Sequence, residues 1–536
     1  MVVIAPRKIL ARLNLAPFAV GLSFLLAGCS ETPTEITAKQ LQWTDTATVQ
    51  MQLSAGELSS VELVQYYLDQ IAANNHSGHD IRAIIEVNPD ALALARELDE
   101  ERQRGYVRSP LHGLPVVLKA NIATRDKMAT TAGATVMKDF ITEKDAALVT
   151  QLRAAGAIIL GKANLSEWAN FRGEDSISGW SGLGGQTRNP YVLTHNPCGS
   201  SAGSGAAVAA DFSLLAIGTE TDGSIMCPAS VNGVVGVKAT RGAVSGYGII
   251  PIASAQDIAG PMTRYVFGAA VLLDAMTTVE AKSRYGELLA EATKRSFTGE
   301  SVVVVRAYDD QFSGVKTMTD NLVRTLKSKG VKVIEVNEWN LPEELYASEF
   351  EVLLYEFKRD LNSWLAEFGA PATDMQAVID YNVANADSEL ALFGQEYFEQ
   401  AVSIDLDEAA KSYNEALFTS RRLAEAHLDR YLKEQGASAI LMPSYGPAWP
   451  TPPQEGAGFS FGTSTAAAVS GYPSITLPLG QEGPLPLGLS VVGLPWSEAN
   501  LFSLAAMLEA ELGGFTPPQF LSTVEADLNL TSATTN

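Results

Sequence analysis

Apolar residues follow two patterns along most of the 536-residue chain, helical spacing and short continuous runs. Between residues 59 and 71 they recur at helical spacing, and Ser59 with Glu62 forms a capping box at the start of that helix. Further helices are predicted at 90–102, 146–155, 316–328 and 497–511. Short apolar runs, which predict buried strands, occupy 114–118, 158–160, 302–305, 331–336, 439–442, 474–478 and 489–492.

Strands that alternate with helices predict an α/β fold, with a mixed, largely parallel sheet covered by helices on both faces. No long Gly-, Ser- or Pro-rich linker divides the chain, so a single large domain is expected from residue 41 to residue 528. Within it, residues 342–432 are helical and rich in charge, which suggests a layer over the functional site. Residues 529–536 are expected to form a flexible tail.

The N-terminus has the pattern of a targeting segment. Arg7, Lys8 and Arg12 precede an apolar stretch at 13–27, which is too short and too proline-interrupted to span a membrane. The sequence LAGC then ends at Cys29 and resembles the bacterial lipobox. This predicts a lipoprotein signal peptide over 1–28, a lipidated Cys29 and a polar tether over 29–40. The expected location is the periplasmic side of a bacterial envelope, with the lipid in the outer membrane because Ser30 follows the cysteine.

Composition describes an ordinary globular protein, with 46% hydrophobic and 18% charged residues. The formal net charge of −23 argues against a basic patch that would bind nucleic acid or anionic lipid. With Cys29 assigned to the lipid, two cysteines remain, Cys198 and Cys227. They could form a disulfide in an oxidising compartment or stay as buried thiols, and the sequence leaves both states open.

The segment 197–242 is dense in glycine and serine, which lets the backbone approach a ligand and expose consecutive N–H groups. One interpretation is the G-x-S-x-G elbow of α/β-hydrolases, centred on Ser201. That elbow needs a preceding strand and a downstream acid and histidine, whereas residues 194–198 do not have a strand pattern and His427 alone follows. A serine hydrolase without a usable histidine needs another base, and a desolvated lysine can serve.

Three motifs in order carry a resemblance to a known family. They are SPLHGLPVVLK ending at Lys119, GSS at 199–201 and GTETDGSI at 218–225. The separation of 24 residues between Ser200 and Ser224 also matches. Together they resemble the amidase signature family over nearly the whole mature chain. The resemblance implies the fold of that family and an enzyme that hydrolyses carboxylic amides without a metal or other cofactor.

Carried over residue by residue, the resemblance makes Ser224 the nucleophile, Ser200 the bridging serine and Lys119 the base. The backbone N–H groups of Thr221, Asp222, Gly223 and Ser224 would form the oxyanion hole. Lys119 must then be neutral in the free enzyme, which predicts activity that is greatest from neutral to alkaline pH. Neither H-E-x-x-H nor a suitable Cys and His spacing occurs, so no metal site is predicted.

Other segments resemble a narrower group, the bacterial peptide amidases, which remove the C-terminal amide of peptides. These segments are GGQTRNPY at 184–191, GIIPIASAQDIAGPM at 248–262 and PSYGPAWP at 443–450. Ala120 departs from the aspartate usual in the family. Within this interpretation Trp449, Phe459 and Phe461 are candidates to line the acyl pocket, although ordinary core packing would equally explain them.

Three alternatives remain at this point. An amidase of aryl or fatty amides would use the same triad, and a lipid anchor makes fatty amides worth testing. A binding lipoprotein that keeps the fold without catalysis is disfavoured by the intact Lys119, Ser200 and Ser224. A tRNA-dependent glutaminase component is disfavoured because the lipobox exports the chain. The sequence does not indicate an oligomeric state.

Overall fold

The computed structural model describes residues 38–285, 295–452 and 458–524. The predicted signal peptide, Cys29 with most of the tether, and the tail 529–536 lie outside these residues. Residues 38–40, predicted as the end of the tether, instead begin helix α1 (Ala38–Leu41). All the described residues belong to one compact unit, as expected for one domain.

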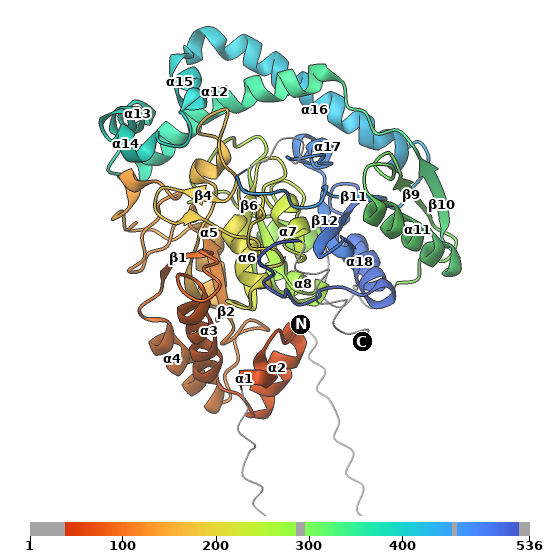
Figure 1. Cartoon of the computed structure of the whole chain (residues 1–536), viewed down its shortest axis with the longest axis horizontal. Coiled ribbons are helices and arrows are strands. Elements are labelled where there is room, and N and C mark those ends of the chain that lie inside the picture. Colours follow the sequence, from red (N-terminus) through yellow and green to blue (C-terminus); the bar gives the residue numbers. More distant parts are fainter. Residues whose placement is uncertain (1–37, 286–294, 453–457, 525–536) are drawn as a thin grey trace, which may run out of the picture. The chain divides into compact units, whose positions relative to one another are not determined.

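An eleven-stranded sheet runs through the described part of the chain (Figure 1). Its strand order is β1-β3-β2-β6-β8-β7-β12-β13-β11-β9-β10, and a separate two-stranded ribbon joins β4 to β5. The strands are β1 Ile84–Val87, β2 Pro115–Lys119, β3 Ile158–Ala163, β4 Trp180–Ser181, β5 Gly185–Gln186, β6 Leu215–Glu220, β7 Val235–Lys238, β8 Ile258–Thr263, β9 Ser301–Val305, β10 Lys332–Val336, β11 Ile440–Pro443, β12 Ser474–Glu482 and β13 Leu485–Val492.

The predicted mixed sheet is confirmed. Parallel pairs join β2 to β3 and β6, and β9 to β10 and β11. The other six neighbouring pairs are antiparallel, so the parallel share is smaller than the sequence indicates. Part of the reason is that β7 and β8 were not expected, because Gly236, Gly260 and Pro261 interrupt their apolar runs.

Helices flank this sheet, and α11 packs against it with an apolar stripe. In this helix Val315, Leu322 and Leu326 are fully buried while the lysines face solvent. Besides α1, the helices are α2 Thr46–Ala55, α3 Ser60–Asn74, α4 Ala91–Gln103, α5 Ala147–Ala154, α6 Ala202–Ala209, α7 Met226–Val231, α8 Val266–Met276, α9 Val279–Tyr285, α11 Ser313–Ser328, α12 Glu343–Phe368, α13 Met375–Ala384, α14 Ala386–Glu389, α15 Glu396–Ser403, α16 Leu406–Leu432, α17 Thr465–Ser470 and α18 Glu498–Leu512.

The charged segment predicted as a helical layer forms α12 to α16. Figure 1 shows the long helices α12 and α16 side by side along one side of the sheet, and they are in contact. Within the described ranges, no helix is both long and apolar enough to cross a membrane.

The sheet brings two chain segments together at one edge. β2 and β6 are parallel neighbours, with Leu118 opposite Ile217. Lys119 is the last residue of β2, and β6 ends at Glu220. Because parallel strands end at the same edge, Lys119 lies beside the loop that leads to Ser224.

Candidate active site

Lys119 is a fully buried lysine at the end of β2. Its Nζ lies 2.7 Å from Ser200 Oγ and donates to the carbonyl oxygen and Oγ1 of Thr219 at 3.1 and 2.8 Å. Burial lowers the pKa of Lys119 from 10.5 to about 7, although the more distant Asp257 and Glu220 oppose this shift. Near neutral pH a large share of this amine is therefore unprotonated and able to accept a proton.

Ser200 is held in a tight turn before α6. The peptide bond between Gly199 and Ser200 is cis, and both serines of the turn are fully buried. A Cβ at Gly199 would lie 2.1 Å from Ser166 Oγ, so only glycine fits there. Ser201 has a different role, because its hydroxyl donates to the Thr219 carbonyl at 3.0 Å and accepts from the Thr219 N–H at 3.1 Å. Ser201 thus ties the turn to β6, which rules against the elbow interpretation.

Ser224 lies in the short connection between β6 and α7. Its carbonyl oxygen accepts from the backbone N–H of Ser201 at 3.1 Å, so its turn abuts the turn that holds Ser200. Glu220 supports the connection, because one carboxylate oxygen accepts from the N–H groups of Ile225 and Met226 at 2.8 and 2.9 Å. These are the two residues directly after the serine, so Glu220 fixes the start of α7.

Gly223 is required by conformation and by space. Its φ is +79°, and a Cβ would lie 2.0 Å from Tyr445 Oη. The neighbouring Asp222 carboxylate accepts from the hydroxyls of Ser464 and Thr465, at 2.5 and 2.7 Å, where α17 begins. Burial raises the pKa of Asp222 above its ordinary value. The predicted oxyanion turn is therefore anchored to a helix more than two hundred residues further along the chain.

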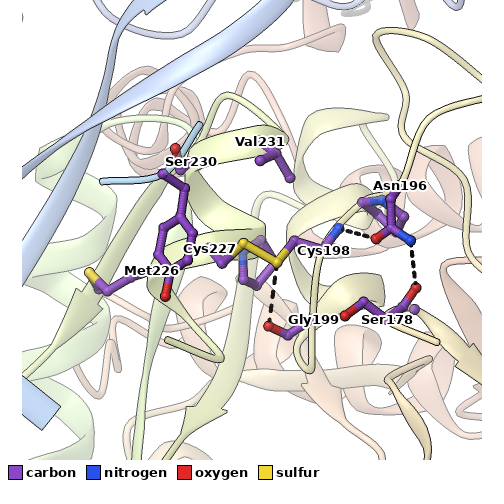
Figure 2. Close-up of a disulfide and its surroundings, with 12 residues drawn as sticks. Ser178, Asn196, Cys198, Gly199, Met226, Cys227, Ser230 and Val231 are labelled. Carbon is purple, nitrogen blue, oxygen red and sulfur yellow. Dashed lines mark hydrogen bonds between the residues drawn. A yellow bond between two sulfur atoms is a disulfide. The ribbon is translucent and has the colours of Figure 1, made fainter. Parts of the chain in front are cut away.

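A disulfide links the two serine turns. Cys198 and Cys227 are bonded, with a Cα–Cα distance of 5.9 Å, and both are buried (Figure 2). Cys198 lies two residues before Ser200, and Cys227 lies three residues after Ser224. Of the two states that the sequence leaves open, the structure has the bonded one. The bond restricts how far the two turns can separate.

A cavity of about 440 Å³ opens beside the end of β6, and neither Ser200 nor Ser224 is among the residues that line it. Thr219, the partner of Lys119, lines it together with Asn121 and Thr221. Thr221 donates its hydroxyl to Asp257 at 2.5 Å, and burial raises the pKa of Asp257 to about 7. Most of the remaining wall is apolar, formed by side chains such as Val244, Ile249, Ile250, Ile252 and Ile258. A cavity with apolar walls and a few convergent polar groups is suited to a small organic or peptide substrate.

The helical layer reaches this cavity through one loop. Gln256 donates to Glu349 of α12 at 2.8 Å, and the N–H of Ala255 donates to Glu356 of α12 at 2.7 Å. Asp257, which follows directly, lines the cavity. The helical layer therefore lies next to the cavity at this loop, as expected.

The three aromatic candidates lie in different surroundings. Phe459 is 56% exposed, and its ring meets the rings of Tyr445 and Trp449 at centroid distances of 6.0 and 5.6 Å. Since Tyr445 contacts the Gly223 turn, Trp449 and Phe459 lie on the side of the nucleophile loop. Phe461 is buried and stacks on Tyr308 at 4.2 Å. None of these three side chains is among those that line the cavity described above.

Several residues of the site were not expected from the sequence. Thr219, Asn121 and Glu220 hold the lysine and the nucleophile turn, while Tyr445 and Ser464 pack behind it. Thr219 and Glu220 lie within the GTETDGSI motif, so their places in the site could have been inferred. The other contacts join segments that local pattern cannot relate. Among the described residues, no cluster of three or more His, Cys, Asp or Glu side chains could hold a metal ion.

A match to a model of a protein family shows which family the chain belongs to. The model described as Amidase matches residues 62–502, most of the length of the chain. The chain belongs to the amidase family. A "probable amidase" of Arabidopsis thaliana is 36% identical to it over 487 residues, which cover 87% of this chain and 89% of the relative. One component of the glutamyl-tRNA(Gln) amidotransferase of Exiguobacterium sibiricum is 31% identical over 487 residues, covering 87% and 96%.

Solved structures of amidases agree with this assignment. The native peptide amidase of Stenotrophomonas maltophilia is 43% identical, with a TM-score of 0.84, and the match covers 90% of this chain and 99% of that one. An amidase family protein of Bacillus anthracis is 32% identical, with a TM-score of 0.79 and coverages of 90% and 93%. The predicted family, its likeness to peptide amidases and the fold are confirmed. This amidase is a hydrolase that acts on amides.

Proposed function

We propose that the amidase removes the C-terminal amide of peptides through Ser224, Ser200 and Lys119, by way of an acyl-enzyme. The observation that carries the proposal is the 2.7 Å contact between Lys119 Nζ and Ser200 Oγ, made in full burial beside the Ser224 turn. The likeness to a peptide amidase of solved structure supports the choice of substrate.

The surroundings of Lys119 suit a neutral amine. A neutral amine has two N–H donors and one lone pair, whereas an ammonium has three donors. The two oxygens of Thr219 take two donors, at 3.1 and 2.8 Å. In the neutral amine the lone pair can then face the third neighbour, Ser200 Oγ, and accept its proton. This arrangement makes Lys119 the general base of the proposed triad.

In the acylation step, Ser224 Oγ attacks the carbonyl carbon of the substrate amide. Its proton passes to Ser200 Oγ as the Ser200 proton passes to Lys119 Nζ. The carbonyl oxygen becomes an oxyanion, which the backbone N–H groups of residues 221–224 stabilise. The tetrahedral intermediate collapses when the C–N bond breaks, and the nitrogen leaves as ammonia with a proton returned through Ser200. Water then attacks the acyl-Ser224 ester by the same proton route and releases the carboxylic acid.

The fold keeps this turn rigid before substrate arrives. Glu220 holds the residues after Ser224, Asp222 holds the turn to α17, and the disulfide joins it to the Ser200 turn. Preorganised donors stabilise developing charge without reorganising during the reaction, so this bracing contributes to catalysis.

The choice between peptide amides and other amides is tested by ammonia release. The substrates are C-terminally amidated peptides, aryl and aliphatic amides, and fatty amides, each run beside Ser224→Ala. Preference for peptide amides, lost in the variant, is the expected result. Turnover of aryl or fatty amides alone would retain the triad and reject the peptide assignment. Trp449 and Phe459 are proposed to contact the substrate outside the cavity, whereas the buried Phe461, which stacks on Tyr308, is not.

A binding protein that keeps the fold without catalysis is the second candidate. The intact triad contacts disfavour it. A fluorophosphonate that labels native protein at Ser224 would exclude it, because only an activated serine reacts in this way.

We also propose that the chain is anchored through a lipid on Cys29 in the periplasm. The lipobox supports this, and the disulfide between Cys198 and Cys227 suits an oxidising compartment. Expression of the full chain with Cys29→Ala in a bacterial host tests it. We expect the wild type in the membrane fraction and the variant in the soluble periplasmic fraction. Equal distribution of the two would refute the anchor.

A further inference from the structure

Asn121 is a buried side chain of the cavity that takes no part in the proposed proton route. It follows Lys119 by two residues and is 2% exposed. Its Nδ2 donates to Thr219 Oγ1 at 3.0 Å and lies 3.5 Å from the carbonyl oxygen of Ile250. Asn121 lines the 440 Å³ cavity, as do both of these partners.

The carbonyl of Ile250 shows which end of the Asn121 carboxamide is the nitrogen and which is the oxygen. A carbonyl oxygen can only accept, so the atom that faces it must be the NH₂ group. The other end, Oδ1, is then the free acceptor. Among the residues that the structure describes, no group donates to Asn121 Oδ1, although this atom is buried. A buried acceptor without a donor is rare and unfavourable, so a donor from a molecule in the cavity would satisfy it.

We propose that Asn121 Oδ1 accepts a hydrogen bond from an N–H group of the substrate and thereby selects peptide amides over analogues in which an ester oxygen replaces that N–H. This inference rests on the proposed function. A peptide amide offers two N–H groups next to the scissile carbonyl carbon. One is the leaving carboxamide nitrogen, and the other is the backbone N–H of the residue that carries it. Either one would pair the buried acceptor.

The apolar wall of the cavity strengthens this selection. Ile249, Ile252 and Ile258 contribute apolar surface to this wall, and a hydrogen bond made against apolar surface is stronger, and a missing one costs more, than in water. A substrate analogue without the N–H would leave Oδ1 unpaired on binding. Sites built in this way reject such analogues strongly.

The test compares three substrates of one sequence in the full protein. They are a peptide amide, its methyl ester, which lacks the leaving N–H, and a depsipeptide amide, in which an ester oxygen replaces the preceding backbone N–H. Each kcat/KM is measured for wild type and for Asn121→Leu, which has nearly the same volume and no acceptor. Asn121→Asp keeps an oxygen acceptor, and Thr219→Val removes the hydroxyl that accepts from both Lys119 and Asn121.

For Asn121→Leu we expect kcat/KM of the peptide amide to fall about ten- to one-hundredfold relative to one of the two analogues. The analogue that keeps its rate identifies the N–H that Asn121 binds. Asn121→Asp is expected to retain the preference, and Thr219→Val to lower all three rates together. If Asn121→Leu also lowers all three by the same factor, Asn121 only positions Thr219 and the proposal is overturned.

Two controls keep the result decisive. Ester turnover by Asn121→Leu shows that the variant is folded. If Asn121→Leu does not fold, the smaller substitution Asn121→Ser is measured in the same way. If wild type hydrolyses no peptide amide, the proposed substrate class fails by itself. The comparison is then made with an amide that the ammonia-release panel shows to be a substrate, together with its matching ester.

Discussion

Replacing Lys119 with methionine should make the protein more stable and change how its stability depends on pH. Burial lowers the pKa of Lys119 from 10.5 to about 7, so the unfolded chain binds more protons than the folded one between these two values. Folding therefore becomes more favourable as pH rises through this window. The penalty is complete below pH 7 and disappears above about 10.5.

The size of the effect follows from the shift. The difference between a pKa of 10.5 in the unfolded chain and about 7 in the folded one corresponds to a full penalty of about 5 kcal/mol in the free energy of unfolding. At pH 9 about 2 kcal/mol of it remains, so wild type should gain about 3 kcal/mol between pH 6 and pH 9 relative to Lys119→Met. The packing change caused by methionine adds a term that does not depend on pH, and it cancels in this comparison.

Urea unfolding at several pH values between 6 and 9, without reductant, measures the difference. Lys162→Met is a matched control, because burial lowers the pKa of Lys162 only to about 8. Its difference from wild type should change by about 1 kcal/mol over the same range. A difference between wild type and Lys119→Met that stays constant from pH 6 to pH 9 would refute the lowered pKa, and with it the neutral base.

Three further variants or treatments test the bracing of the site. Ser201→Ala removes both hydrogen bonds to β6 and should lower the free energy of unfolding by about 1–3 kcal/mol, while acylation at Ser224 persists; loss of acylation in a stable variant would contradict the structural role of Ser201. Gly223→Ala should lower kcat at least tenfold and destabilise the fold by about 1–3 kcal/mol, because the new Cβ would clash with Tyr445 Oη and because the residue has a positive φ. Wild-type kinetics in this variant would show that the turn is not strained. Reduction of the disulfide between Cys198 and Cys227 opens a covalently closed loop with a sequence separation of 29, and it should lower the free energy of unfolding by about 3–4 kcal/mol. Equal melting curves with and without reductant would argue against the bond.

The sequence predicted those features that depend on local pattern. The apolar runs at 114–118, 158–160 and 302–305 are buried strands, and the charged segment 342–432 is helical. The strands β7 and β8 were missed because glycine and proline interrupt their apolar runs, and their burial comes from neighbours on both sides in the sheet.

Contacts between distant segments explain most of what the sequence did not predict. Asp222 is bound by side chains 242 and 243 residues further along, and the bond between Cys198 and Cys227 needed the two turns to meet. Asn121 stands two residues from Lys119, yet its unpaired oxygen becomes visible only once the cavity is formed.

The central claim is that Ser224 is a nucleophile activated by a buried neutral lysine. Fluorophosphonate labelling of the intact protein, mapped by peptide mass spectrometry at pH 6, 7 and 8, tests it most directly. We expect a label on Ser224 that forms faster as pH rises through about 7, and that disappears in Ser224→Ala. A label on Ser201, or labelling of Ser224 at a rate that does not change with pH, would contradict it.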